Sequence, residues 1–273
     1  MINIPMKSGQ PLDRNSVMSV NQRKVQGSTS FQTIANINNP SFSADSPAPA
    51  AHAAPVPQNR TPAAPQAQPV RTSGPVSTPA APGPQFTPPS LLHPVQKGQK
   101  VALNGVSSTS KIRVSLGWNT KDSRCDVDVS AFMLGASGKV IGDDWFVFYG
   151  QEESPDHSMQ FHGEDTTDRE FITIDLSKLN PSVTKIVFVL TINEALENRL
   201  NFSMLSDAYI RVLLSPGNTE VVSFKMSDYY SNVTSMMIGE VYAHNGAWKF
   251  NAIGNGVARD LAGLCELYGV QTV

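Results

Sequence analysis

The sequence has few cysteines and no long apolar run. Cys125 and Cys265 are the only cysteines among 273 residues, too few for a disulfide framework. Neither belongs to a Cys-x-x-Cys pair or to a regular cysteine–histidine pattern. We therefore expect both to be reduced and the protein to be cytoplasmic, although a single bridge between them stays open. No segment approaches the roughly 20 apolar residues that a membrane-spanning helix needs, and residues 1–7 lack the apolar segment of a secretory signal.

An excess of positive charge is also missing. The chain has 21 Lys and Arg against 23 Asp and Glu, a formal net charge of −2. Residues 1–95 carry six bases and two acids, whereas residues 96–273 carry the other 15 bases and 21 acids. The two parts therefore differ in sign, at +4 and −6. Because no folded part is strongly basic, we do not expect the chain to bind nucleic acid.

Composition divides the chain into three parts. Residues 1–45 are polar and show no sustained periodicity, so we predict that they are disordered. Residues 46–96 are rich in proline and alanine, and we predict an extended linker. Its Pro-x-x-Pro spacings leave open a second role as a ligand for an aromatic groove on a protein partner. Residues 97–273 have enough bulky apolar side chains to form one folded domain.

Short apolar runs separated by turn residues predict strands in the last part. In residues 112–118 the alternation places Ile112, Val114, Leu116 and Trp118 on one face. The other predicted strands are residues 126–133, 145–149, 171–176, 185–192, 209–214, 220–226, 236–243 and 248–253. Asn245-Gly246 between two apolar runs is a strong hairpin signal.

Only the end of the chain has a helical pattern. An apolar face is formed there by Val257, Leu261, Leu264, Cys265 and Tyr268. Gly269 follows as a suitable helix stop. We predict an all-β fold, an antiparallel β-sandwich with a short C-terminal helix, preceded by a disordered Pro/Ala-rich N-terminal region.

The sequence contains no recognisable catalytic arrangement. It has no glycine-rich phosphate loop between a strand and a helix, no Gly-x-Ser-x-Gly motif, and no nucleophile and base in a familiar order. His157 and His162 flank one loop without the spacing of a zinc site. We predict that the protein is not an enzyme.

Acidic side chains concentrate between residues 122 and 170. Asp126 and Asp128 are two apart on a predicted strand, so they should leave the same face about 6.5–7 Å apart at Cα. Such charges repel unless water screens them or a cation lies between them. Ca²⁺ accepts 6–8 oxygen ligands in irregular geometry, so one interpretation is a calcium site. A solvated acidic rim and the carboxylates of a hydrolase are the alternatives.

A series of short motifs runs through residues 97–273. They are residues 97–103, 117–118, 126–132, 138–140, 146–149, 154–156, 175–178, 185–189, 201–202, 208–211, 239–242, 244–250 and 269–270. In order and spacing they resemble the TerD domain family of tellurium-resistance and stress-response proteins. Residues 1–95 have no counterpart in this resemblance.

The resemblance implies a β-sandwich that binds calcium through acidic loops at one end. The metal ligands that it implies are Asp126, Asp128, Asp143, Glu164, Asp165 and Asp168. The second acidic loop, residues 162–170, departs from the family pattern because it is shorter and because Arg169 interrupts its acidic run. Glu164-Asp165 also stands where Asp-Asn is usual, and Trp145 and Gly150 replace an acid and an Asn. We therefore expect weaker or fewer Ca²⁺ sites than in a typical member.

The function that these observations predict is a calcium-responsive, non-enzymatic interaction module of the stress-response or tellurium-resistance type. We expect protein partners, and a peripheral membrane complex stays open. One alternative is a metal-independent structural adaptor that works through its Pro-rich arm. Another is a cyclic-nucleotide-binding relative, for which the sequence offers no phosphate-binding device.

Overall fold

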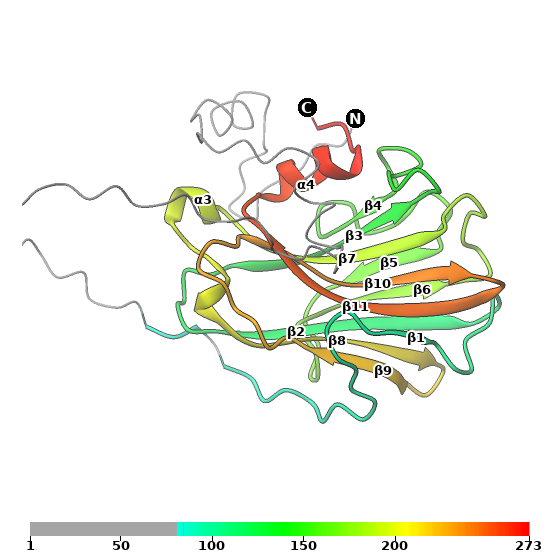
Figure 1. Cartoon of the computed structure of the whole chain (residues 1–273), viewed down its shortest axis with the longest axis horizontal. Coiled ribbons are helices and arrows are strands. Elements are labelled where there is room, and N and C mark those ends of the chain that lie inside the picture. Colours follow the sequence, from blue (N-terminus) through cyan, green and yellow to red (C-terminus); the bar gives the residue numbers. More distant parts are fainter. Residues whose placement is uncertain (1–80, 84, 273) are drawn as a thin grey trace, which may run out of the picture. The chain divides into compact units, whose positions relative to one another are not determined.

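The computed structural model describes residues 81–83 and 85–272 (Figure 1). The disorder predicted for residues 1–45 lies outside the described residues, as do residues 46–80 of the linker predicted for residues 46–96. The described part forms the domain discussed below.

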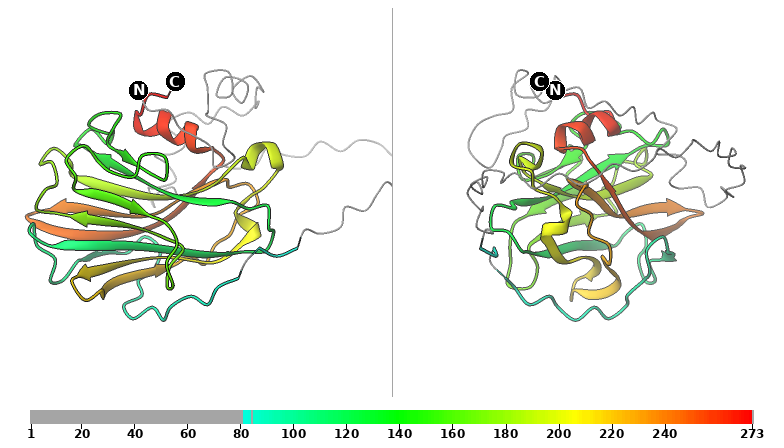
Figure 2. Two further views of the ribbon diagram at one scale, coloured as in Figure 1. Left: turned by 180° about the vertical axis from the view of Figure 1, so that it is seen from behind. Right: turned by 60° about the vertical axis from the view of Figure 1, so that its left-hand side comes forward.

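Two antiparallel sheets form the domain. In spatial order, the first sheet contains β1 (Lys100–Ala102), β11 (Ala247–Val257), β10 (Ser235–His244), β7 (Lys185–Ile192), β3 (Val127–Leu134) and β4 (Phe146–Val147). The second sheet contains β5 (Met159–His162), β6 (Glu170–Asp175), β2 (Lys111–Thr120), β8 (Leu205–Ser215) and β9 (Thr219–Lys225). Figure 2 shows the two sheets as separate layers. The predicted antiparallel β-sandwich is confirmed.

The main core lies between the sheets. The predicted apolar face of β2 is confirmed, since Ile112, Val114, Leu116 and Trp118 are all buried. A second apolar cluster covers the outer face of the first sheet, where Val187 and Val189 of β7 pack with Leu264 and Cys265. Strand β7 is therefore apolar on both faces, and its sequence is a nearly continuous hydrophobic run.

The C-terminal helix α4 (Leu261–Tyr268) supplies that outer cover. Asp260 caps it by accepting a hydrogen bond from the Gly263 N–H, and Gly269 ends it at φ 82°. The helix therefore begins later than predicted, because Val257 is the last residue of β11. The prediction that Cys265 faces a core is confirmed.

Several short elements were not predicted from the sequence. They are α3 (Ala195–Asn198), the 3₁₀ turn η1 (Phe202–Met204), β1 and β5. Each has only three or four residues, too few to show a period in the sequence. The strand predicted at residues 145–149 is also shorter, because β4 covers only Phe146–Val147.

Residues 85–95, which we call the strap, lie against the second sheet. The Phe86 backbone exchanges two hydrogen bonds with the side chain of Asn119, at 2.9 and 3.0 Å. The backbone N–H groups of Leu92 and His93 both donate to Oε1 of Glu220, at 2.7 and 2.8 Å. The strap then pairs with Ser223 of β9. It thus covers the edge of the second sheet, although the sequence analysis places these residues in the linker.

Candidate functional site

The structure places the first three predicted metal ligands in different elements. Strand β3 starts at Val127, so Asp126 is an exposed residue of the β2–β3 loop and Asp128 is a buried residue of the strand. The expectation that both lie on one strand was wrong for Asp126. Asp143 lies beyond the other end of β3, about 25 Å away along an eight-residue strand. There, its Oδ1 accepts a hydrogen bond from the Gln271 N–H at 2.8 Å.

Asp165 and Asp168 belong to a cluster with two arginines on the outer face of the second sheet. Arg211 holds Asp168 with two hydrogen bonds, at 3.1 Å from Nε and 2.9 Å from Nη2. Arg113 Nη2 donates to Asp168 at 2.9 Å and also to Asp165. The Asp168 side chain is fully buried. With Tyr209, these four residues form what we call the arginine cluster.

Tyr209 also binds the carboxylate of Asp168. Its hydroxyl donates to Oδ1 of Asp168 at 2.8 Å, and burial, together with the Asp168 charge, raises the pKa of Tyr209 well above its usual value. Its register partner on β2 is Gly117. A Cβ at Gly117 would lie 2.5 Å from the Tyr209 ring. Glycine at this position therefore allows the ring to lie on the sheet.

Aromatic stacking supports the cluster on its other side. The Arg113 guanidinium lies 3.5 Å from the centre of the Phe171 ring, and His162 stacks on the same phenyl ring at 4.5 Å. Burial and the nearby Arg113 charge lower the pKa of His162. The imidazole is thus favoured in its neutral form.

The β5–β6 loop is held by Asp165 as well. Oδ1 of Asp165 accepts hydrogen bonds from the N–H groups of Thr167 and Asp168, at 2.7 and 2.8 Å. Burial alone would raise the pKa of Asp165, but the Arg113 hydrogen bond and these backbone donors lower it overall. Arg113 and the two backbone donors therefore stabilise the charged form of the Asp165 carboxylate.

Arg169 pairs with the remaining predicted ligand, Glu164. Its Nη1 donates to Glu164 Oε1 at 2.9 Å, and its Nε donates to the Trp118 carbonyl oxygen at 3.3 Å. The same guanidinium lies 4.9 Å from the centre of the Phe86 ring. Arg169 therefore joins the acidic loop to the strap.

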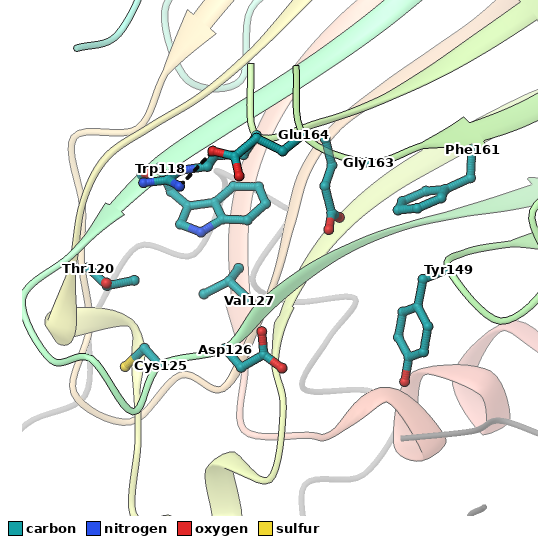
Figure 3. A pocket seen from close by; sticks show the side chains of 11 residues that line it. Trp118, Thr120, Cys125, Asp126, Val127, Tyr149, Phe161, Gly163 and Glu164 are labelled. Carbon is teal, nitrogen blue, oxygen red and sulfur yellow. Dashed lines mark hydrogen bonds and ion pairs between the residues drawn. The ribbon is translucent and has the colours of Figure 1, made fainter. Parts of the chain in front are cut away.

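A cavity of about 370 Å³ opens beside this loop, between the two sheets. Its polar lining includes Asp126, Glu164, Arg169 and Glu170. Its aromatic lining consists of Trp118, Tyr149 and Phe161, and the rings border the same space as Asp126 (Figure 3). We call it the end pocket.

The six predicted calcium ligands do not converge in the end pocket. Ca²⁺ needs 6–8 oxygens at about 2.3–2.6 Å, yet among residues 81–83 and 85–272 no three carboxylate, imidazole or thiol groups converge to hold a metal ion. Of the six predicted ligands, Asp165, Asp168 and Glu164 are bound by arginines, and Asp143 lies at the other end of β3. The described residues thus do not fit the implied ion, and calcium binding stays a prediction.

The thiol in the end pocket is not activated. Cys125 is buried, and burial raises its pKa to about 11. Since the thiolate is the nucleophile, the group is inert at neutral pH.

The chain is similar to a known domain family and to several named proteins. The TerD domain matches residues 92–268, more than half of the chain. The chain belongs to the TerD domain family. A TerD tellurium resistance protein of Alcaligenes sp is 39% identical over 186 residues, 65% of this chain and 97% of that protein. The corresponding protein of Serratia marcescens is 38% identical with the same coverage.

A further relative of this TerD chain carries a stress-response name. General stress protein 16U of Bacillus subtilis (strain 168) is 36% identical over 185 residues, 64% of this chain and 96% of that protein. A solved structure of a TerD homologue from Streptomyces coelicolor A3(2) has 18% identity and a TM-score of 0.45, over 60% of this chain and 99% of the other.

Three side chains of the arginine cluster were not among the predicted site residues. They are Arg113, Arg211 and Tyr209, each at a polar or outward position in the alternation of its strand. None of the helices in the described part of the chain is long and apolar enough to cross a membrane.

Proposed function

We propose that this chain is a non-catalytic interaction module in a stress response of the tellurium-resistance type, and that arginines rather than a metal ion hold its acidic loop. The relatives with 36–39% identity support the stress-response and resistance role. The observation that supports the metal-independent part is the double engagement of buried Asp168 by Arg113 and Arg211.

The surface that we assign to recognition is the end of the sandwich around the end pocket. Asp126 and Glu164 are exposed there. The loop that carries Glu164 is anchored by the arginine cluster, and the strap is attached to it through Arg169. A preformed surface of this kind binds without ordering cost, which suits an interaction module.

The cyclic-nucleotide alternative receives little support from the geometry. Among the described residues that line the end pocket, a phosphate would meet the acids Asp126, Glu164 and Glu170 and the cation Arg169. Such a charge balance repels an anion. The adaptor alternative depends on the Pro-rich arm, most of which lies outside the described residues.

Survival under stress tests the proposed role. The full chain is expressed in a tellurite-sensitive bacterial host, and growth is followed on tellurite and on peroxide. We expect the wild type to protect, and the double variant Asp126→Asn, Glu164→Gln to protect less at equal protein level. Asp144→Asn, an exposed acid at the other end of β3, is the matched control. Equal protection by the double variant and the wild type would contradict the assignment of this surface.

A further inference from the structure

The strap is held on the second sheet as an extended peptide is held in a groove. The Phe86 ring lies 4.9 Å from the Arg169 guanidinium and 6.3 Å from the centre of the Tyr209 ring. The Asn119 side chain binds both the N–H and the carbonyl oxygen of Phe86. Main-chain hydrogen bonds and a place for one aromatic side chain are elements of peptide recognition.

The later part of the strap pairs with β9 in the parallel direction. Pro94 is the residue paired with Ser223. The Ser223 carbonyl oxygen accepts a hydrogen bond from the Val95 N–H at 2.8 Å, and the Ser223 N–H donates to the His93 carbonyl oxygen at 2.9 Å. These bonds use backbone groups alone, so another extended segment can form them as well.

Two buried polar atoms of β9 have no hydrogen-bond partner among the described residues. They are Oε2 of Glu220 and Oγ of Ser223, and the two residues are only 5% and 0% exposed. Oε1 of the same Glu220 carboxylate accepts the two strap N–H groups, so Oε2 lies at the contact with the strap. Because a buried polar atom without a partner is unfavourable, the strap fills this groove incompletely.

Both atoms lie on the outer face of the second sheet. Ser223 and Glu220 pair with Arg211 and Leu213 of β8, which are two residues apart and therefore leave the same face of the sheet. The Arg211 guanidinium on this face donates to Asp168. The groove thus offers an acceptor and a hydroxyl to whatever segment lies along β9.

The register also shows which strap side chains lie on this face. Pro94 pairs with Ser223, and Leu92 precedes it by two residues, so both side chains leave toward the same side. Neither side chain has a hydrogen-bond donor, and Leu92 is 67% exposed. The Leu92 N–H lies 2.7 Å from the Glu220 carboxylate. A basic side chain at this position can therefore donate to Oε2 in a charge-assisted hydrogen bond.

We infer that this groove binds an extended peptide of a protein partner, with an aromatic residue at the Phe86 position and a basic residue at the Leu92 position. The strap is the intramolecular competitor that the partner replaces. The inference rests on the proposed function, because it names a partner class for the interaction module. Since the strap is tethered, it acts at an effective concentration on the order of millimolar, and the added bond to Glu220 offsets that advantage.

Fluorescence anisotropy with labelled peptides tests this inference on the full chain. The parent peptide has the sequence of residues 85–95, and the test peptide carries Leu92→Lys. The comparison peptide carries Leu91→Lys, which adds the same charge on the opposite face. We expect the Leu92→Lys peptide to bind at least about tenfold more tightly than the other two, the effect of one hydrogen bond to a charged group. Adding Phe86→Ala to it should weaken its binding.

Variants of the full chain locate the effect. In Glu220→Gln, which keeps an acceptor for the two strap N–H groups, the advantage of the Leu92→Lys peptide over the parent should disappear. Asn198→Ala, which loses only a local bond to Glu194, should bind both peptides as the wild type does. Leu92→Lys in the chain's own strap changes an exposed position and should weaken peptide binding, because the strap then competes better.

Four results would overturn the inference. Equal affinities of the Leu92→Lys and Leu91→Lys peptides would reduce it to a general charge effect, and equal affinities of the Leu92→Lys and parent peptides would assign the groove to the strap of a second copy. The others are an advantage that persists in Glu220→Gln and peptide binding that Leu92→Lys in the strap leaves unchanged.

The peptide titration and the survival assay fail independently. Because peptide binding is measured directly, its absence with intact stress protection would remove the partner class alone. Loss of protection with intact peptide binding would remove only the proposed cellular role.

Discussion

The β5–β6 loop and its surroundings contain two groups of acids that differ in their burial and in the charged groups around them. In the arginine cluster, Asp165 and Asp168 face two guanidinium groups, and the Asp168 side chain is fully buried. In the end pocket, Asp126 is exposed, and Arg169 is the cation among the described residues that line the cavity. The first group fixes the loop on the sheet. The second group lines a cavity together with aromatic rings. The comparison shows that acid content alone does not identify a binding site.

The largest effect is expected from opening the arginine cluster. Arg211→Met removes both hydrogen bonds from a guanidinium to a fully buried carboxylate. Breaking one side of a buried ion pair costs about 3–5 kcal/mol when the remaining charge has no other partner. Because Arg113 and Tyr209 still bind Asp168 in this variant, we expect a loss of about 3 kcal/mol, the lower end of that range. Urea denaturation should show a fall of that size in the free energy of unfolding.

The control for this variant is an exposed ion pair of the same sheet. Lys225→Met removes the contact with Asp207, in which the side chains are 53% and 38% exposed. We expect a loss below about 1 kcal/mol. If Arg211→Met cost no more than Lys225→Met, the arginine cluster would not be the anchor of the loop.

A smaller effect is expected from crowding the same cluster at Gly117. In Gly117→Ala the new methyl group meets the Tyr209 ring, which must move away from Asp168. Overpacking of this kind costs about 1–3 kcal/mol. Thermal denaturation compares this variant with Gly163→Ala, whose Cβ would have no neighbour within 4 Å. Equal melting temperatures for the two variants would contradict the close packing of Tyr209 on β2.

The strap offers a weaker test, because water can replace its hydrogen bonds. Asn119→Ala removes the two bonds to the Phe86 backbone, and we expect a loss of about 1 kcal/mol. Limited proteolysis should also cut residues 85–90 faster than in the wild type. Asn198→Ala, which loses only a local bond to Glu194, is the comparison. Unchanged cleavage in Asn119→Ala would mean that this contact does not hold the strap.

The smallest effect concerns pH. The pKa of His162 is lowered in the folded protein, so below about pH 6.5 the unfolded state takes up more protons and stability falls. The lowered pKa of Asp165 adds stability that is present above the ordinary carboxyl pKa and is lost as pH falls through the folded value. Unfolding measured from pH 8 to pH 2 should show both declines in stability, and His162→Phe should lose the one at higher pH. A stability that rises on acidification in this range would contradict both assignments.

Much of the fold could be predicted from the sequence, because alternation in β2 and the Asn245-Gly246 turn are local signals. Tertiary contacts decided the rest. Val257 continues a strand because β10 pairs with it, although its spacing suits the helix face. The strap was predicted as linker because its contacts are made by backbone groups, and such contacts leave no periodic pattern of side chains in the sequence.

The site was harder to predict. In the sequence, Asp165 and Asp168 lie near other acids. Their arginine partners are distant in the chain: Arg113 is 52 residues from Asp165, and Arg211 is 43 residues from Asp168. Only the pairing of β2 with β6 and β8 brings these charges together. Arg169 was the one local indication that the acidic run is interrupted.

The most direct measurement is the melting temperature of the full chain in EDTA and in millimolar CaCl₂. Calcium at about 100 times its Kd would add about 2.7 kcal/mol to the stability of the folded state, a rise of roughly 5–10 °C for a domain of this size. Because arginines already neutralise Asp165 and Asp168, we expect the two temperatures to agree within about 1 °C. A rise of several degrees that disappears in Asp126→Asn would show that a bound ion, and not the arginine cluster alone, holds the acidic loop.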